Sequence, residues 1–163
     1  MSKVFGLTSR YTPVSNETSR RVFAYGIEPV DEKNSTWFEV FFYKKQYPEV
    51  TLDMLKEAIY ADANAETDRR ILEDFVWEGK KVWLSSENQF NFKAAYDLAV
   101  QTKGKSLPVK FKLGENDGEP VYHTFDDMGE FTDFYTSALA FINQCLNEGW
   151  ERKDSIDWSV YDI

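Results

Sequence analysis

Residues 75–84 read Phe-Val-Trp-Glu-Gly-Lys-Lys-Val-Trp-Leu, two short apolar runs around a central Glu78-Gly79 pair. Tight hairpin turns need positive φ angles, which glycine adopts without steric cost. The β-branched and aromatic residues on either side favour strands. This stretch therefore predicts a β-hairpin, and the rest of the chain repeats its pattern of a hairpin followed by a helix.

A helix is predicted directly after this hairpin. Ser86 precedes Gln89 by three positions, which is the spacing of a capping box. Phe90, Ala94 and Leu98 then recur at helical intervals, so we expect them to form the buried face of that helix.

The segment after residue 106 predicts another hairpin and the longest helix. Apolar residues alternate with polar ones over 107–113 and 121–125, with a turn expected at 114–120. Asp126 is a suitable N-cap for a helix over about residues 127–148, and Gly149 fits the position just after a helix end. The tail after this helix carries Trp158 and Tyr161, so we expect it to pack against the fold.

The segment before residue 75 predicts the first hairpin and helix. Residues 36–43 form the strongest β run of the chain and are expected to pair with residues 22–27. Strict alternation fails at Phe41-Phe42-Tyr43, so both faces of this strand are expected to be covered, and a partner is one candidate cover. Thr51 is a suitable N-cap for the helix that follows.

The predicted class is α+β, with antiparallel β-hairpins alternating with helices three times and a long C-terminal helix. We expect three regions. Residues 1–20 show no period and predict an extended N-terminal arm, residues 21–48 an N-terminal β-hairpin that serves as a docking region, and residues 49–163 a compact α+β domain.

Charge excludes some partners. The net charge is -9, and a field of that sign repels nucleic acid and anionic membranes. Residues 1–22 carry four cations and one anion, a net +3, whereas residues 113–163 carry two cations and twelve anions, a net -10. No apolar run approaches the roughly 20 residues of a membrane span, and the N-terminus does not resemble a secretory signal. We therefore expect neither nucleic-acid binding nor membrane insertion.

The sequence predicts no catalytic residue, no metal site and no cofactor. His123 is the only histidine and Cys145 the only cysteine, which is too few for a histidine- or cysteine-based metal cluster. The eight glycines are scattered singly, so no phosphate-binding loop is indicated. We expect His123 and Cys145 to be structural and the protein not to be an enzyme.

Binding is the function that the residues themselves favour. Tyrosine and tryptophan are common anchors at protein interfaces, and aromatic rings also stack on sugars. We expect most of the tryptophans to lie in the core and the remainder to be available for contacts. The five are Trp37, Trp77, Trp83, Trp150 and Trp158.

Four stretches form a pattern that covers residues 65–158: 68–84, 86–96, 126–142 and the ending 149–158. This pattern resembles a bacteriophage domain of unknown function, found in tail-fibre-associated proteins and in small prophage proteins of gut Bacteroidetes and their phages. Asp74 stands where the family usually has glycine. Residues 20–37 resemble the front portion of the shorter members. The resemblance implies a phage context and transfers no catalytic residue.

The residues indicate a non-enzymatic binding protein, and the resemblance implies that it is a structural or docking protein of a tailed-bacteriophage virion, associated with its tail, baseplate or fibre. The expected partners are other phage structural proteins and further copies of the chain. The expected location is the virion and, during assembly, the host cytoplasm. The alternatives are a tail-fibre assembly chaperone absent from the mature particle, a host-glycan or receptor-binding module, and a glycoside hydrolase with paired carboxylates.

Overall fold

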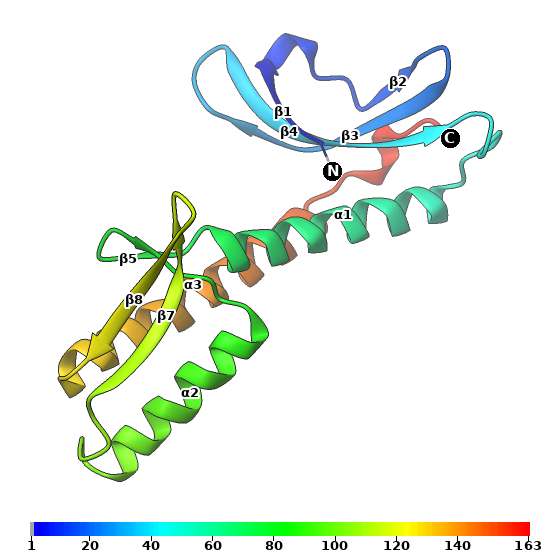
Figure 1. Cartoon of the computed structure of the whole chain (residues 1–163). Coiled ribbons are helices and arrows are strands. Elements are labelled where there is room, and N and C mark those ends of the chain that lie inside the picture. Colours follow the sequence, from blue (N-terminus) through cyan, green and yellow to red (C-terminus); the bar gives the residue numbers. More distant parts are fainter. Residues whose placement is uncertain (1) are drawn as a thin grey trace. The chain divides into compact units, whose positions relative to one another are not determined.

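The computed structural model of the chain describes residues 2–163 (Figure 1). Antiparallel hairpins alternate with helices three times, which confirms the predicted α+β class. The strands are β1 (Ser2–Leu7), β2 (Val14–Asn16), β3 (Arg20–Pro29), β4 (Asn34–Tyr43), β5 (Val76–Trp77), β6 (Lys80–Lys81), β7 (Val109–Asn116) and β8 (Glu119–Phe125). The helices are α1 (Leu52–Glu73), α2 (Ser86–Gln101) and α3 (Met128–Asp154), with short 3-10 helices at Thr8–Arg10 and Trp158–Val160.

The chain forms two compact units, whose boundaries fall within α1 and α3. Unit 1 contains the residues up to Glu66 together with Gly149–Ile163, and unit 2 contains Thr67–Glu148. Residues 49–163, predicted to form one compact domain, are divided between the two units. The first part of α1 and the C-terminal tail share a hydrophobic core with strands β3 and β4.

The predicted N-terminal arm is also wrong, because residues 2–16 supply the two edge strands of a four-stranded sheet. The strand order is β1-β4-β3-β2, and all neighbours are antiparallel. β1 pairs with β4 over six positions, from Ser2 opposite Glu39 to Leu7 opposite Asn34. β2 has only three residues and pairs with β3 at Arg21–Phe23. The strands are short and a 3-10 turn separates them, so their sequence shows no sustained period.

One face of this sheet carries the core of unit 1. Alternate residues of β3 and β4 point toward the first part of α1, and Tyr161 of the tail joins them. The tail therefore packs down as predicted, with Trp158 against Tyr60 at 5.8 Å between ring centroids. Thr51 caps α1 as predicted, since its hydroxyl accepts a hydrogen bond from the backbone N–H of Met54. The buried members of the core are Phe23, Tyr25, Phe38, Val40, Phe42, Val50, Leu55, Ile59, Ala63 and Tyr161.

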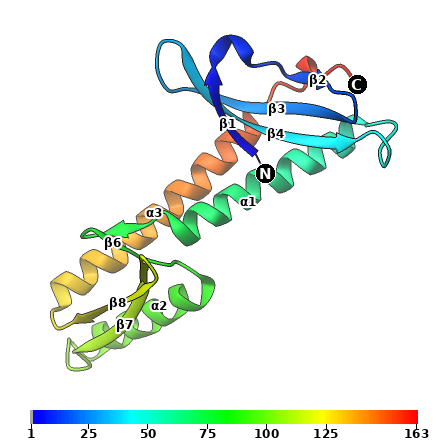
Figure 2. The same ribbon diagram turned by 45° about the horizontal axis from the view of Figure 1, so that its top comes forward.

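Unit 2 combines two hairpins with α2 and the larger part of α3 (Figure 2). The β5–β6 hairpin turns at Glu78 and Gly79, with φ angles of 46° and 74°, as its sequence predicts. The core of unit 2 is mainly aromatic. Phe125 stacks on Phe131 at 4.7 Å, and Phe134 lies 4.9 Å from Phe125.

Within residues 2–163, no helix combines the length and apolar character of a membrane span.

Several predicted boundaries shift. Ser85 rather than Ser86 caps α2, and Asp127 rather than Asp126 caps α3, because these side chains accept hydrogen bonds from the N–H groups of Asn88 and Glu130. The β7–β8 turn is confined to Asp117 and Gly118 instead of spanning 114–120.

The predicted end of the long helix at Gly149 is also wrong, since α3 continues to Asp154. The extra turn is used within unit 1. Arg152 stacks over the Phe38 ring, with its guanidinium carbon 4.8 Å from the ring centroid, and Lys153 donates a 2.8 Å hydrogen bond to Asn64. These contacts offset the low helix propensity of glycine.

Candidate interaction surfaces

The sheet face opposite α1 is partly covered by the chain itself. The segment between β1 and β2 passes over this face (Figure 1). It places Tyr11 edge-on against Trp37 at 5.9 Å, and Gly6 approaches the same indole so closely that an added Cβ would lie 3.0 Å from it. Trp37 is consequently buried. This explains one part of the aromatic run in β4, whose residues point alternately to both faces.

Farther along β4 the same face is open. Phe41 and Tyr43 are 39% and 47% exposed, with their rings edge-to-face at 5.5 Å. The guanidinium of Arg20 lies 5.0 Å from the Phe41 ring centroid and is held by a 2.6 Å ion pair with Glu17. We call Arg20, Phe41 and Tyr43 the aromatic patch.

The charge on the aromatic patch is fixed. The hydrogen bond that Arg20 donates to Glu17 lowers the pKa of the Glu17 carboxyl, so the pair stays ionised at neutral pH. Lys44 adds a second cation nearby, with its ammonium bonded to the Glu17 carbonyl oxygen at 2.5 Å. The patch therefore presents aromatic rings beside cations in a chain that is acidic as a whole.

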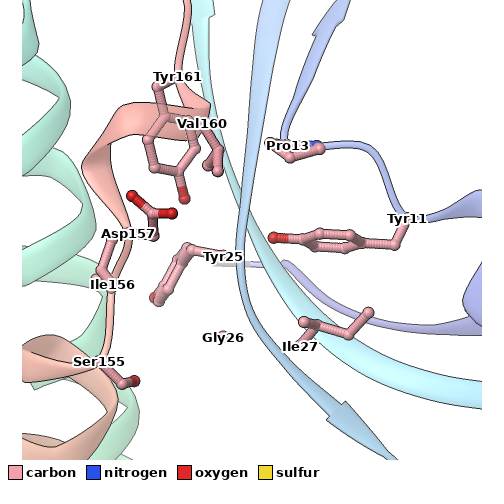
Figure 3. A pocket seen from close by; sticks show the side chains of 10 residues that line it. All are labelled: Tyr11, Pro13, Tyr25, Gly26, Ile27, Ser155, Ile156, Asp157, Val160 and Tyr161. Carbon is pink, nitrogen blue, oxygen red and sulfur yellow. The ribbon is translucent and has the colours of Figure 1, made fainter.

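Unit 1 also contains a pocket of about 250 Å³ beside the part of β3 that extends beyond its pairing with β2 (Figure 3). Tyr11 and Pro13 form one wall, and the tail from Ser155 to Tyr161 forms the other. The hydroxyls of Tyr11 and Tyr161 both donate to the carbonyl oxygen of Ala24, at 3.3 and 2.9 Å. Both hydroxyls therefore donate within the chain, and the bond from Tyr161 connects the tail to the sheet.

The ionisable groups in this pocket are also committed to internal contacts. Burial raises the pKa of Tyr161 and of Tyr25, so both phenols stay protonated at neutral pH. Tyr25 donates a 2.7 Å hydrogen bond to Asp62 of α1. Hydrogen bonds from Ser159 lower the pKa of Asp157, which caps the last 3-10 turn. The lowered pKa of Asp157 is the opposite of the raised pKa that a general acid needs at neutral pH.

In unit 2 the predicted buried stripe of α2 faces solvent instead. Phe90 is 71% exposed and Leu98 is 52% exposed, with Ala94 exposed between them. The buried residues of α2 are Phe92 and Ala99. Both stripes have apolar members at helical spacing. Phe92 packs edge-to-face against the core rings of Phe111 and Phe134, and this contact decides the orientation of the helix.

An apolar pocket of about 190 Å³ lies between α2 and α3 next to this exposed stripe. Its lining is mostly hydrophobic, and Phe90 and Leu139 stand at its exposed rim, with Leu139 42% exposed. Lys93 is at the rim as well and pairs with Asp97 at 2.5 Å. We call this pocket with its rim the helical face.

His123 and Cys145 lie in unit 2, and their contacts are those of residues that stabilise the fold. His123 Nε2 is 2.8 Å from Glu130 Oε1, and its ring packs against Trp77 and Phe125 at 5.2 and 4.6 Å. Cys145 is buried, and burial raises the pKa of its thiol, which leaves it a poor nucleophile. Among the described residues, no three His, Cys, Asp or Glu side chains form a group that could hold a metal ion.

The tryptophans divide between core and surface. Trp37 and Trp77 are buried, Trp158 is half-buried, and Trp83 and Trp150 are 38% and 54% exposed. The most open aromatic ring is instead that of Phe90, among the exposed apolar residues that the structure describes. Helical spacing predicted Phe90 to be buried, and only the packing of Phe92 shows that it points to solvent.

The fold and these surfaces define a two-unit α+β protein whose most prominent surface features are exposed apolar groups. Residues 54–163 match the model of a family described as a domain of unknown function (DUF4376), and the chain belongs to that family. No curated protein and no solved structure matches the chain. The matched region begins inside α1, so strands β1 to β4 precede it, whereas the tail that completes the core of unit 1 lies within it.

Proposed function

We propose that this protein is a non-enzymatic structural or docking component of a tailed-bacteriophage particle, associated with its tail, baseplate or fibre. The phage context comes from the resemblance of residues 65–158 to a domain of tail-fibre-associated and small prophage proteins of gut Bacteroidetes and their phages. Its partners would be other proteins of the particle. It would be found in virions and, before assembly, in the host cytoplasm.

The aromatic patch is the observation that carries the docking role. Tyrosine and arginine are enriched among the residues that dominate binding energy at protein interfaces. Here Tyr43 and Phe41 restrain each other through their edge-to-face contact, and Arg20 is paired with Glu17 beside them. Rings that are already fixed lose little conformational entropy on binding. Such a surface suits a partner that offers apolar groups and carboxylates.

A quantitative mass-spectrometric analysis of gradient-purified particles tests this proposal, using a phage that encodes the chain. A fixed copy number per particle is the expected result. Absence from particles, together with abundance in infected cells, would overturn the structural role and favour an assembly chaperone.

The patch itself is tested with the double variant Phe41→Glu, Tyr43→Glu. Both side chains are exposed, so we expect the variant to fold and to be lost from particles. Tyr122→Glu is the matched control, because Tyr122 is 53% exposed on a strand of unit 2. If the double variant enters particles at the normal copy number, the aromatic patch is not the docking surface.

A further inference from the structure

The helical face of unit 2 leaves a bulky apolar group uncovered beside an apolar cavity. Phe90 projects from α2 with 71% of its surface exposed, at the rim of the pocket between α2 and α3. The cavity wall includes Leu84, Phe92, Tyr135, Ala138, Leu139 and Ile142. Exposed apolar groups of this size next to a cavity mark binding surfaces.

The size of the cavity fits one aromatic side chain. Benzene occupies an engineered apolar cavity of about 150 Å³ in another protein. The present pocket measures about 190 Å³ and is open to solvent at its rim. A phenyl ring therefore fits with little rearrangement. Phe90 supplies such a ring on the same surface as the cavity.

A projecting ring and a matching cavity on one surface are what a two-fold interface requires. In such an interface the same patch of both copies meets, so each feature must find its complement on that patch. Two copies related by a two-fold axis can each insert Phe90 into the cavity of the other. A heterologous partner would need a ring for the cavity and a separate hollow for Phe90.

The distribution of charge also favours a second copy at this face. The net charge is -9, so most of the surface repels another copy. Residues 134–145 of α3 contain no charged residue, although 29% of the chain is charged. The charge of Lys93 at the rim is balanced by its ion pair with Asp97. Depletion of charge is the compositional mark of an interface core.

We propose that the protein self-associates through unit 2 across a two-fold axis, with Phe90 of each copy seated in the pocket between α2 and α3 of the other. The interaction goes beyond docking in a phage particle and does not involve the aromatic patch. The two proposals can therefore fail separately.

Sedimentation velocity on the full chain tests the self-association. We expect a monomer–dimer equilibrium with a Kd between about 1 µM and about 1 mM. Phe90→Glu is expected to weaken the dimer about 30-fold or more, as removal of a dominant interface residue does. Val76→Glu, at a 53% exposed position elsewhere in unit 2, is the control and should leave the dimer unchanged.

A cross-linking experiment tests the geometry. Cys145 is buried and is the only natural cysteine, so an added surface cysteine is the reactive thiol. Leu139→Cys is expected to form covalent dimers with a short bismaleimide reagent, and Val76→Cys is not. Three results would each overturn the proposal: a monomer throughout the concentration range, a dimer unaffected by Phe90→Glu, or equal cross-linking of the two cysteine variants.

Discussion

The hydroxyl of Tyr161 donates a 2.9 Å hydrogen bond to the carbonyl oxygen of Ala24, although the two residues are 137 positions apart. The bond ties the end of the chain to strand β3 inside unit 1. The family match covers residues 54–163 and so includes Tyr161 but not Ala24. The matched region therefore contains only part of the core of unit 1, and the N-terminal sheet supplies the rest.

We predict that Tyr161→Phe lowers the free energy of unfolding of unit 1 by about 1 kcal/mol, the net contribution of one hydrogen bond. Tyr161→Ala should cost about 3–5 kcal/mol, because it also leaves a cavity where a ring that is only 7% exposed now packs. Urea denaturation of the two variants measures both values. Equal effects of the two substitutions would show that the ring contributes nothing.

Alkaline pH should destabilise unit 1. Burial raises the pKa of Tyr25 and of Tyr161 above the ordinary value of 10.0. Above that value the unfolded chain releases these protons while the folded state retains them, so deprotonation favours unfolding. Stability is thus fully present below pH 10 and falls as the pH rises further.

This pH effect can be assigned by comparing the urea midpoints of the natural chain and Tyr161→Phe at about pH 8 and about pH 11. The variant is expected to lose less stability between the two pH values, because one of the phenols with a raised pKa is gone. Identical losses would attribute the alkaline transition to other groups.

Deletion of residues 1–16 should destabilise unit 1. The deletion removes β1 and β2, so it exposes the edge of β4 and uncovers Trp37, which is now only 5% exposed. Burial of a large aromatic side chain contributes several kcal/mol. Hydrogen exchange should show lost protection in β3 and β4 while unit 2 keeps its own. Unchanged protection in β4 would contradict this prediction.

Local chemistry made parts of this fold predictable. Glycine sets the turn at Glu78-Gly79. Ser, Thr and Asp residues predict the N-cap of each of the three helices to within one position. The sequence did not predict strand pairing between distant segments. β1 and β2 are ordered by pairing with strands up to 37 positions away, and nothing in their own residues indicates this.

The candidate surfaces were predictable only in part. The break in alternation at Phe41-Phe42-Tyr43 indicated a strand covered on both faces, and the structure shows that part of one face is left open. For α2, Phe90 and Phe92 have the same chemistry, so a helical period could not decide which of them is buried. The choice depends on the rings of Phe111 and Phe134, which come from later segments of the chain.

Gly114 shows how a backbone approach in unit 2 depends on the absence of a side chain. An added Cβ would lie 2.9 Å from the carbonyl oxygen of Lys81 and 3.3 Å from the Trp83 ring. The backbone N–H of Trp83 also donates a 2.8 Å hydrogen bond to Leu113, which holds the two segments together. The carbonyl oxygen of Lys81 belongs to the backbone and the indole of Trp83 is rigid, so little room is left to relax.

We therefore predict that Gly114→Ala lowers the free energy of unfolding of unit 2 by about 1–3 kcal/mol, the usual cost of overpacking a tight site. Asn116→Ala in the same strand is the control, because its side chain is exposed and nothing close by must move. Urea denaturation compares the two, and hydrogen exchange at the Trp83 amide reports whether the β6–β7 contact has opened. If Gly114→Ala is as stable as the control, the two strands can separate at no cost, and the close approach is not a constraint on the fold.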